Sequence, residues 1–220
     1  MKTRLLISLL LVGTLLLFAS CSGMRAPQET KMTKENNEQR TEETMQFACD
    51  VVFFGDSITA QGNFDELFPE LRVVNLGVYG DTLEDLLRRV PKVRAADPAK
   101  IFLLGGINSL GPLSVEECLR QYDELLAALR AACPAAELYV ESVLPVGAEF
   151  DLYPGGANDL VRAFNESLKA LAERYGLTWV ELYALYEKDG ALDPALTVDG
   201  VHLTAAAYGP WAELITPYLK

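Results

Sequence analysis

The sequence predicts an α/β protein in which helices cover both faces of a parallel sheet of about five strands. Two observations predict this fold class. From residue 49 onward, short apolar segments alternate with amphipathic ones, and this alternation implies right-handed crossovers and a doubly wound sheet. The short segments are also uniformly apolar rather than apolar at every second position, which is typical of parallel strands buried on both faces.

Five short segments are expected to form the strands, namely 50–54, 72–76, 100–104, 137–142 and 178–182. Apolar residues that recur at helical spacing predict helices between and after them. These helices are expected around 83–90, 115–129, 160–171 and 211–218. Ser114 and Glu117 predict a capping box at the start of the second helix, and Gly176 is suited to end the third.

Residues 1–20 do not belong to this fold. Lys2 and Arg4 precede a long apolar stretch that ends in small residues, which is the pattern of an export signal. The segment "FASC" at 18–21 resembles the lipobox of bacterial lipoproteins, although Phe18 departs from the usual leucine. The resemblance implies that Cys21 is lipidated and that the domain lies in the bacterial cell envelope, outside the cytoplasm. Residues 1–20 could alternatively be an ordinary secretory peptide or an uncleaved membrane anchor.

Residues 21–48 are expected to form a disordered tether, because they contain too few apolar residues to offset the entropy of ordering. A flexible chain of this length reaches roughly 30 Å. It would hold a soluble domain near a membrane, with the lipid as its only membrane contact. Residues 49–220 then form one domain, since a chain of 220 residues is long enough for one well-buried core.

Charge and composition exclude two classes of function. The net charge is −12, and residues 1–20 carry two positive and no negative charges, so the rest of the chain has −14. A nucleic-acid-binding domain needs the opposite sign. His202 is the only histidine, and the sequence shows no metal-ligand cluster, so neither a metal nor a cofactor is expected.

Cys118 and Cys133 fall near opposite ends of one predicted helix, too far apart for a disulfide.

Polar motifs follow the predicted strands. "GDSIT" comes after the first strand, "NLGVYGDT" spans the end of the second, "GGINS" follows the third, and "DGVHLT" lies beyond the last. In doubly wound sheets, ligands bind beyond the carboxyl ends of the strands. We therefore expect these four segments, which are distant in the sequence, to converge on one edge of the sheet.

Serine, histidine and aspartate in these motifs indicate nucleophilic catalysis. A serine hydroxyl is a poor nucleophile at neutral pH, so Ser57 would need a base, and His202 is the only imidazole in the chain. Asp199 could hold the ring in the correct tautomer and stabilise the imidazolium. Thr59 stands two positions after Ser57, where the nucleophile elbow of an α/β-hydrolase has glycine, which argues against that fold.

The ordered set of four motifs resembles the SGNH hydrolases, also called GDSL-type lipases and acylhydrolases, over essentially all of residues 50–219. This resemblance implies a single three-layer α/β/α domain with a parallel five-stranded flavodoxin-like sheet. It also implies an oxyanion hole made by the backbone N–H groups of Ser57 and Gly80 and the side-chain amide of Asn108. Ser109 departs from the family pattern, which usually has aspartate there. We expect this change to affect the loop rather than the chemistry.

Each of these residues also has a simpler interpretation on its own. Ser57 could cap a helix, Gly80 could serve backbone geometry alone, and Asn108 could sit in a left-handed turn. His202 could be a surface residue, and Asp199 with Gly200 could form an ordinary turn.

Two functional hypotheses follow. The first is a membrane-tethered serine esterase that removes an acetyl or other short acyl group through an acyl-enzyme intermediate. The phrases "GGINS", "ESVLPV" and "DGVHLT" resemble small bacterial carbohydrate or acetyl esterases, although a short acyl chain on another alcohol and a lysophospholipid stay open. The second is a catalytically idle lipoprotein that binds a glycan or small ligand. Residues 145–158, with Phe150, Leu152 and Tyr153, are expected to shape the pocket. The sequence makes no prediction of oligomeric state.

Overall fold

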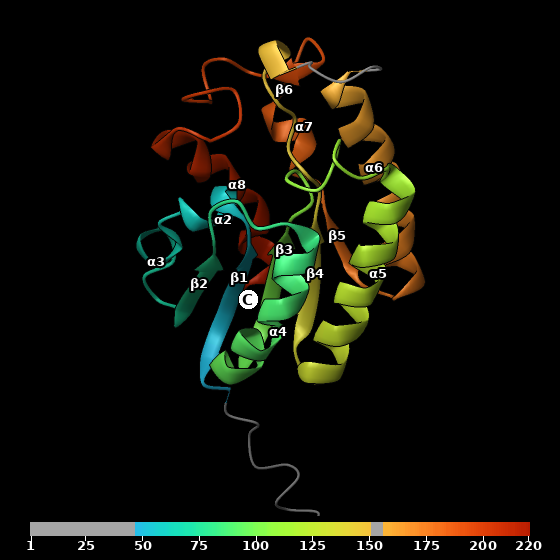
Figure 1. Ribbon diagram of the computed structural model, residues 1–220. Coiled ribbons are helices and arrows are strands. Elements are labelled where there is room, and N and C mark those ends of the chain that lie inside the picture. Colours follow the sequence, from blue (N-terminus) through green and yellow to red (C-terminus); the bar gives the residue numbers. More distant parts are fainter. Residues whose placement is uncertain (1–46, 151–155) are drawn as a thin grey trace, which may run out of the picture. The chain divides into compact units, whose positions relative to one another are not determined.

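The fold was analysed in a computed structural model, which describes residues 47–150 and 156–220. A five-stranded parallel sheet lies between two layers of helices (Figure 1). Its strands are β1 (Cys49–Gly55), β2 (Val73–Gly77), β3 (Pro98–Leu104), β4 (Glu137–Glu141) and β5 (Thr178–Val180). The strand order β2-β1-β3-β4-β5 is that of flavodoxin, so the predicted fold class and all five predicted strands are confirmed.

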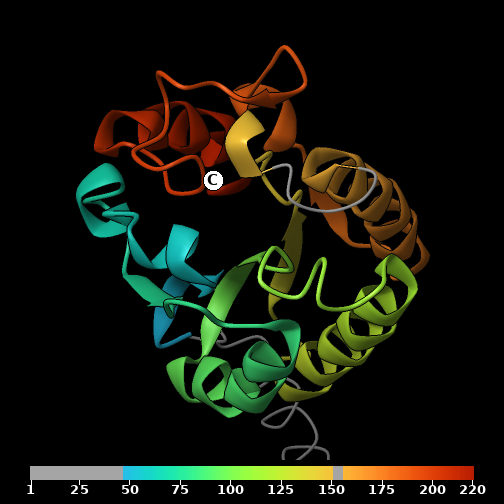
Figure 2. The same ribbon diagram turned by 45° about the horizontal axis from the view of Figure 1, so that its top comes forward.

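Helices cover both faces of the sheet, and Figure 2 shows the two layers from above. One layer consists of α4 (Leu83–Ala96), α5 (Val115–Ala132) and α6 (Ala157–Arg174). The other contains α8 (Tyr208–Ile215) together with three short helices. The short helices are α2 (Ser57–Ala60), α3 (Phe64–Leu67) and α7 (Tyr183–Tyr186).

The central strand β1 explains why the strands are uniformly apolar. Val52 and Phe54 pack into the core beneath α4, α5 and α6, whereas Val51 and Phe53 pack into the core on the opposite face. Because side chains alternate between the faces of a strand, both sets must be apolar. On the α8 side, the Phe53 ring stacks on that of Phe64 with the ring centroids 3.7 Å apart.

The helix ends agree only partly with expectation. Ser114 accepts a hydrogen bond from the backbone of Glu117, as predicted, but the carboxylate of Glu117 accepts from Arg120. The predicted capping box is therefore only half formed. A complete capping box begins α4, where Thr82 and Asp85 each accept from the other's backbone. Gly176 follows the end of α6 with a φ of +65°, the left-handed conformation that glycine adopts freely.

Several short elements were not predicted. They are α2, α3 and α7, a hairpin of β6 (Glu187–Lys188) and β7 (Ala191–Leu192), and the 3-10 helices η1 (Ala148–Phe150) and η2 (Ala205–Ala207). The helix predicted at 211–218 is formed by α8, which begins earlier, and by the 3-10 helix η3 (Thr216–Tyr218) that follows it. Cys49, Cys118 and Cys133 are free thiols.

Among the described residues, no helix combines the length and apolarity needed to cross a bilayer. The predicted signal peptide, Cys21, and all but the last two residues of the predicted tether lie outside the described residues.

Candidate active site

Ser57 is the first residue of α2, directly after β1, at the carboxyl edge of the sheet. The preceding residue, Asp56, is the cap of this helix, because its side chain accepts a hydrogen bond from the N–H of Ile58. The interpretation of Ser57 as a helix cap is therefore wrong. Its Oγ atom is free to point elsewhere, and the backbone N–H of a first helical residue has no partner within the helix.

His202 lies in the loop between β7 and η2, and Asp199 holds the conformation of that loop. One carboxylate oxygen, Oδ1, accepts from the backbone N–H groups of Val201 and His202, at 3.0 and 2.8 Å. The loop is fixed further by Thr197, whose hydroxyl donates to the carbonyl oxygen of His202 at 2.7 Å. Gly200 takes a φ of +84° at the centre of the turn.

A chain of hydrogen bonds joins the three predicted catalytic residues. The Nδ1 atom of His202 lies 2.7 Å from Oδ2 of Asp199, and its Nε2 atom lies 2.9 Å from Oγ of Ser57. Because an ionised carboxylate only accepts hydrogen bonds, Nδ1 must carry the proton. In the neutral imidazole, Nε2 is then unprotonated and accepts from the serine hydroxyl. The structure thus brings together Ser57, Asp199 and His202, and their arrangement can transfer a proton from the serine to the imidazole.

Asp199 is held in its ionised form. The hydrogen bonds from the backbone and the ring of His202 lower its pKa to about 2. The carboxylate therefore stays negative throughout the pH range in which an imidazole titrates, and it can stabilise the imidazolium that forms when Ser57 loses its proton.

Asn108 lies in the loop after β3 and faces the same edge of the sheet. Its side-chain amide donates one hydrogen bond, 2.9 Å long, to the carbonyl oxygen of Asp81. An amide has two N–H groups, so the second is available to a bound substrate. Asp97 and Asp189 are the only non-glycine residues with positive φ in the described segments, so the alternative of a left-handed turn at Asn108 is wrong.

Gly80 lies in the loop after β2, in a turn closed by a hydrogen bond from the N–H of Asp81 to the carbonyl of Val78. Its φ of +77° favours glycine, so the simpler interpretation, that Gly80 serves backbone geometry, applies. This interpretation is compatible with a role for the N–H group of Gly80. A Cβ atom at Gly80 would have nothing within 4 Å, whereas one at Gly77 would lie 2.2 Å from the backbone nitrogen of Ala60. Gly77 therefore serves close packing, while Gly80 faces open space.

Arg89 of α4 holds these loops together, and sequence reasoning missed it. Its side chain donates to the carbonyl oxygens of Gly55 and Leu76, at 3.0 and 2.8 Å, and forms a salt bridge with Asp81. Gly55 precedes the Asp56–Ser57 pair, and Leu76 lies at the end of β2. Because only 12% of the Arg89 side chain is exposed, this cation serves the framework and is not available to a ligand.

Ser109 also supports the site. Its side chain is buried, and its Oγ atom accepts a hydrogen bond of 2.9 Å from the backbone N–H of Leu83, the first residue of α4. The serine thus links the loop after β3 to the start of α4. This contact agrees with the expectation that the position serves the loop.

Asp56 places a second carboxyl group beside the nucleophile. Burial raises its pKa to about 7, and the hydrogen bond from Ile58 and the nearby His202 oppose this rise. Its Oδ2 atom is buried and has no hydrogen-bond partner among the described residues. The carboxyl group is therefore partly protonated near neutral pH, and it titrates close to the reaction centre.

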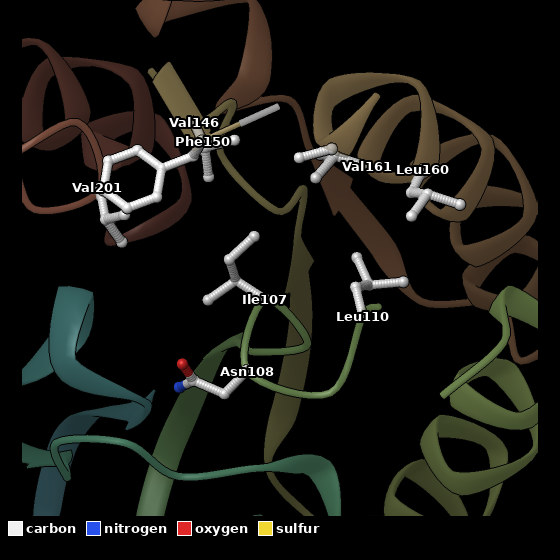
Figure 3. Close-up of a pocket in the computed structure, with 9 residues that line it drawn as sticks. Ile107, Asn108, Leu110, Val146, Phe150, Leu160, Val161 and Val201 are labelled. Atoms are coloured by element: carbon white, nitrogen blue, oxygen red, sulfur yellow. The ribbon is translucent and has the colours of Figure 1, made fainter. Parts of the chain in front are cut away.

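A mainly apolar pocket of about 210 Å³ opens beside Asn108 (Figure 3). Asn108 is its one polar lining side chain within the described part of the chain. The other lining residues are Ile107, Leu110, Val146, Phe150, Ala157, Leu160, Val161 and Val201. Phe150, which was expected to shape the pocket, does line it, whereas Leu152 and Tyr153 lie outside the described residues. No cluster of three or more potential metal ligands occurs in segments 47–150 and 156–220.

Comparison with known proteins identifies the family. The profile of the GDSL-like Lipase/Acylhydrolase family matches residues 53–209, which include Ser57, Gly80, Asn108, Asp199 and His202. None of the curated proteins compared with the chain matches it significantly.

Solved structures share the fold. A Streptococcus pneumonia protein whose name refers to platelet activating factor aligns with a TM-score of 0.69 at 24% identity, over 88% of this chain and 94% of that one. A GDSL-like lipase from Bacteroides thetaiotaomicron aligns with a TM-score of 0.66 at 20% identity, over 84% and 96%. An acetyl xylan esterase aligns with a TM-score of 0.65 at 18% identity, over 78% and 100%.

Proposed function

The chain belongs to the GDSL-like lipase/acylhydrolase family, and from this premise we propose that it is a serine esterase that removes an acetyl or other short acyl group. Ester hydrolysis is the general activity that membership of this family supports. The observation that carries the specific proposal is the hydrogen-bonded chain from Ser57 through His202 to Asp199. Carbohydrate O-acetyl esters are among the candidate substrates.

The reaction proceeds in two halves. In the first, the Oγ atom of Ser57 attacks the ester carbonyl while Nε2 of His202 takes the hydroxyl proton. The negative charge on the former carbonyl oxygen is stabilised by the N–H groups of Ser57 and Gly80 and by the amide of Asn108. When this intermediate collapses, His202 returns the proton to the departing alcohol oxygen, and an acyl-serine remains.

In the second half, water attacks the acyl-serine. His202 takes a proton from the water and then protonates Oγ of Ser57, which releases the carboxylic acid and restores the enzyme. Each step uses only groups of the protein and water. A chelator is therefore expected to leave the rate unchanged.

The size of the pocket favours a short acyl group. Its volume of about 210 Å³ is below the range of roughly 300–1,000 Å³ that is usual for drug-sized ligands. Because Asn108 belongs both to the proposed oxyanion hole and to the pocket wall, a carbonyl bound at this amide would direct its acyl chain into the pocket. The intact Ser57–His202 pair argues against the alternative of an idle binding protein.

A series of nitrophenyl esters tests this proposal. The protein should hydrolyse the acetyl ester, and kcat/KM should fall for the hexadecanoyl ester, whose chain exceeds the pocket. Ser57→Ala should abolish both activities. Phe150→Ala enlarges the pocket and should shift the preference toward longer chains. Hydrolysis that survives in Ser57→Ala, or a wild-type preference for the hexadecanoyl ester, would contradict the proposal.

We also propose that Cys21 carries the lipid and that the domain works in the cell envelope. This part is supported by the lipobox-like segment at 18–21 and the polar segment that follows it. The membrane contact would be the lipid alone.

A further inference from the structure

Three large apolar side chains stand out on the surface. Val78, Tyr79 and Val198 are 39%, 65% and 68% exposed, and the described residues include no other exposed large hydrophobic side chain. A single exposed apolar residue is ordinary in a soluble protein. Here, however, Val78 and Tyr79 directly precede Gly80, and Val198 directly precedes Asp199. Two separate loops thus present apolar side chains next to the proposed catalytic groups.

Tyr79 and Val198 lie on the histidine side of the site. The ring centroids of Tyr79 and His202 are 6.5 Å apart. Val198 is joined to the same loop, because its backbone N–H donates to the carbonyl oxygen of His202. The acyl pocket, in contrast, opens beside Asn108.

The chemistry of ester cleavage decides which part of the substrate each region contacts. His202 must protonate the departing alcohol oxygen, so the alcohol has to leave beside Nε2 of its ring. With the acyl group in the pocket next to Asn108, the alcohol extends toward Tyr79. The exposed apolar side chains therefore face the alcohol half of the ester.

The charges around the site restrict the kind of alcohol. Five segments at the carboxyl edge of the sheet contain aspartate and glutamate but no lysine or arginine, namely 55–71, 77–87, 105–119, 142–150 and 189–212. Lys188 of the β6–β7 hairpin and Arg162 of α6 also lie at this edge, but they are paired with Asp193 and Asp159. Arg89 lies nearby, but its guanidinium is paired with Asp81. A phosphorylated alcohol such as a lysophospholipid headgroup would meet only cations already paired with carboxylates among these residues, and the unpaired carboxylates would repel it.

We propose that Val78, Tyr79 and Val198 form a subsite for the alcohol half of the substrate, and that this alcohol is a neutral sugar ring. The inference rests on the proposed esterase function. One face of a sugar ring consists of C–H groups, whose partial positive charge suits the negative face of an aromatic ring. Tyr79 supplies that face, and its large exposure leaves room for a ring to stack on it. Val78 and Val198 widen the apolar platform.

Competition between two acetyl esters tests this subsite. One is an acetylated methyl glucoside and the other is ethyl acetate, which has the same acyl group but an alcohol too small to reach Tyr79. In Tyr79→Ala, the ratio of kcat/KM for the sugar ester to that for ethyl acetate should fall about tenfold, mainly through KM. Tyr79→Phe keeps the aromatic face and should restore the wild-type ratio.

Four results would overturn the inference. They are an unchanged ratio in Tyr79→Ala, an equal loss for both esters, a kcat/KM for the acetylated glucoside 6-phosphate above that of the neutral sugar ester, and hydrolysis of ethyl acetate by the wild type without hydrolysis of the sugar ester. An equal loss would mean that Tyr79 supports His202 rather than the alcohol. Failure of the wild type to hydrolyse either acetyl ester would instead contradict the proposed function. Hydrolysis of ethyl acetate without hydrolysis of the sugar ester would contradict only the subsite.

Discussion

The Nε2 atom of His202 lies 2.9 Å from the Oγ atom of Ser57, although 145 positions separate the two residues in the sequence. Ser57 is placed by the end of β1, and His202 by a turn that Asp199 organises. Because the end of β1 fixes Ser57 and the turn organised by Asp199 fixes His202, the pair is held in position before a substrate binds. Such preorganisation is what general-base catalysis by an imidazole requires.

Asn108→Ala should lower kcat about 100-fold or more, because it removes one donor from the oxyanion hole. KM should change much less, since this hydrogen bond is strongest in the transition state. Steady-state kinetics with a short-chain ester measures both parameters. A kcat within a few-fold of the wild-type value would assign the oxyanion role to backbone donors alone.

Ser109→Ala is the matched control for this experiment. Asn108 and Ser109 both tie their loop to residues around the start of α4, through the carbonyl of Asp81 and the N–H of Leu83 respectively. Loss of the Ser109 hydroxyl leaves a buried N–H without an acceptor and should reduce the free energy of unfolding by about 1–3 kcal/mol. It should affect kcat far less than Asn108→Ala does. Equal losses of kcat would mean that Asn108 acts only through loop structure.

Glu141→Gln should weaken the pH dependence of stability. Burial raises the pKa of Glu141 to about 8 from its ordinary value of 4.5, partly offset by the hydrogen bond from the indole of Trp211. Between these two values the folded state binds more protons than the unfolded state, so stability falls as pH rises from about 4.5 through 8. The effect is at most about 5 kcal/mol, because the two pKa values differ by about 3.5 and one pKa unit corresponds to about 1.4 kcal/mol.

Thermal unfolding between pH 5 and pH 8 measures this effect. The glutamine can still accept from Trp211 but does not titrate, so the Tm of the variant should fall less than that of the wild type. Some decline should persist, since burial also raises the pKa of Asp56. Glu166→Gln, on the exposed face of α6, is the control and should follow the wild type. Parallel curves for wild type and Glu141→Gln would disprove the assignment.

Cys21 is expected to incorporate labelled fatty acid when the full chain is produced in a bacterial host. Cys21→Ala should remain unlabelled, which shows that any label is specific to this position. If the wild-type domain is exported without label, the chain carries an ordinary secretory signal instead.

The sequence was sufficient to predict the sheet and the convergence of the motifs. Strands such as β1 are apolar on both faces, and parallel strands bring their carboxyl ends to one edge, where Ser57 and Asn108 follow β1 and β3. Short elements such as the β6–β7 hairpin could not be predicted, because strands of two residues carry no periodic pattern.

The contacts that support the site join residues that are distant in the sequence, so they could not be predicted from it. In the sequence, Arg89 is an ordinary polar residue of an amphipathic helix, and only the folded chain places it against Gly55, Leu76 and Asp81. The contact of Ser109 with Leu83 likewise joins the loop after β3 to the first residue of α4. The capping box shows the limits of a short pattern, since it was predicted at Ser114 but is complete only at Thr82.

Two groups near Ser57, Asp56 and His202, could produce a pH dependence of the rate, and a variant of Asp56 separates their effects. Asp56 has a pKa raised to about 7, whereas the pKa of Asp199 is lowered to about 2, so Asp199 does not titrate near neutrality. Asp56→Asn keeps a good helix cap and removes the titration. If His202 is the general base, kcat/KM of this variant should still fall on acidification, because an imidazolium cannot accept the serine proton.

The rate of ester hydrolysis by His202→Ala, measured across the same pH range as the wild type, tests the catalytic assignment most directly. Because the histidine lies in a loop outside both apolar cores, the variant should fold, which its unfolding transition can verify. The account predicts that turnover is abolished in His202→Ala and reduced less severely in Asp199→Asn, where the aspartate orients the ring but takes no proton. A folded His202→Ala protein that hydrolyses the ester at nearly the wild-type rate, with an unchanged pH profile, would contradict it.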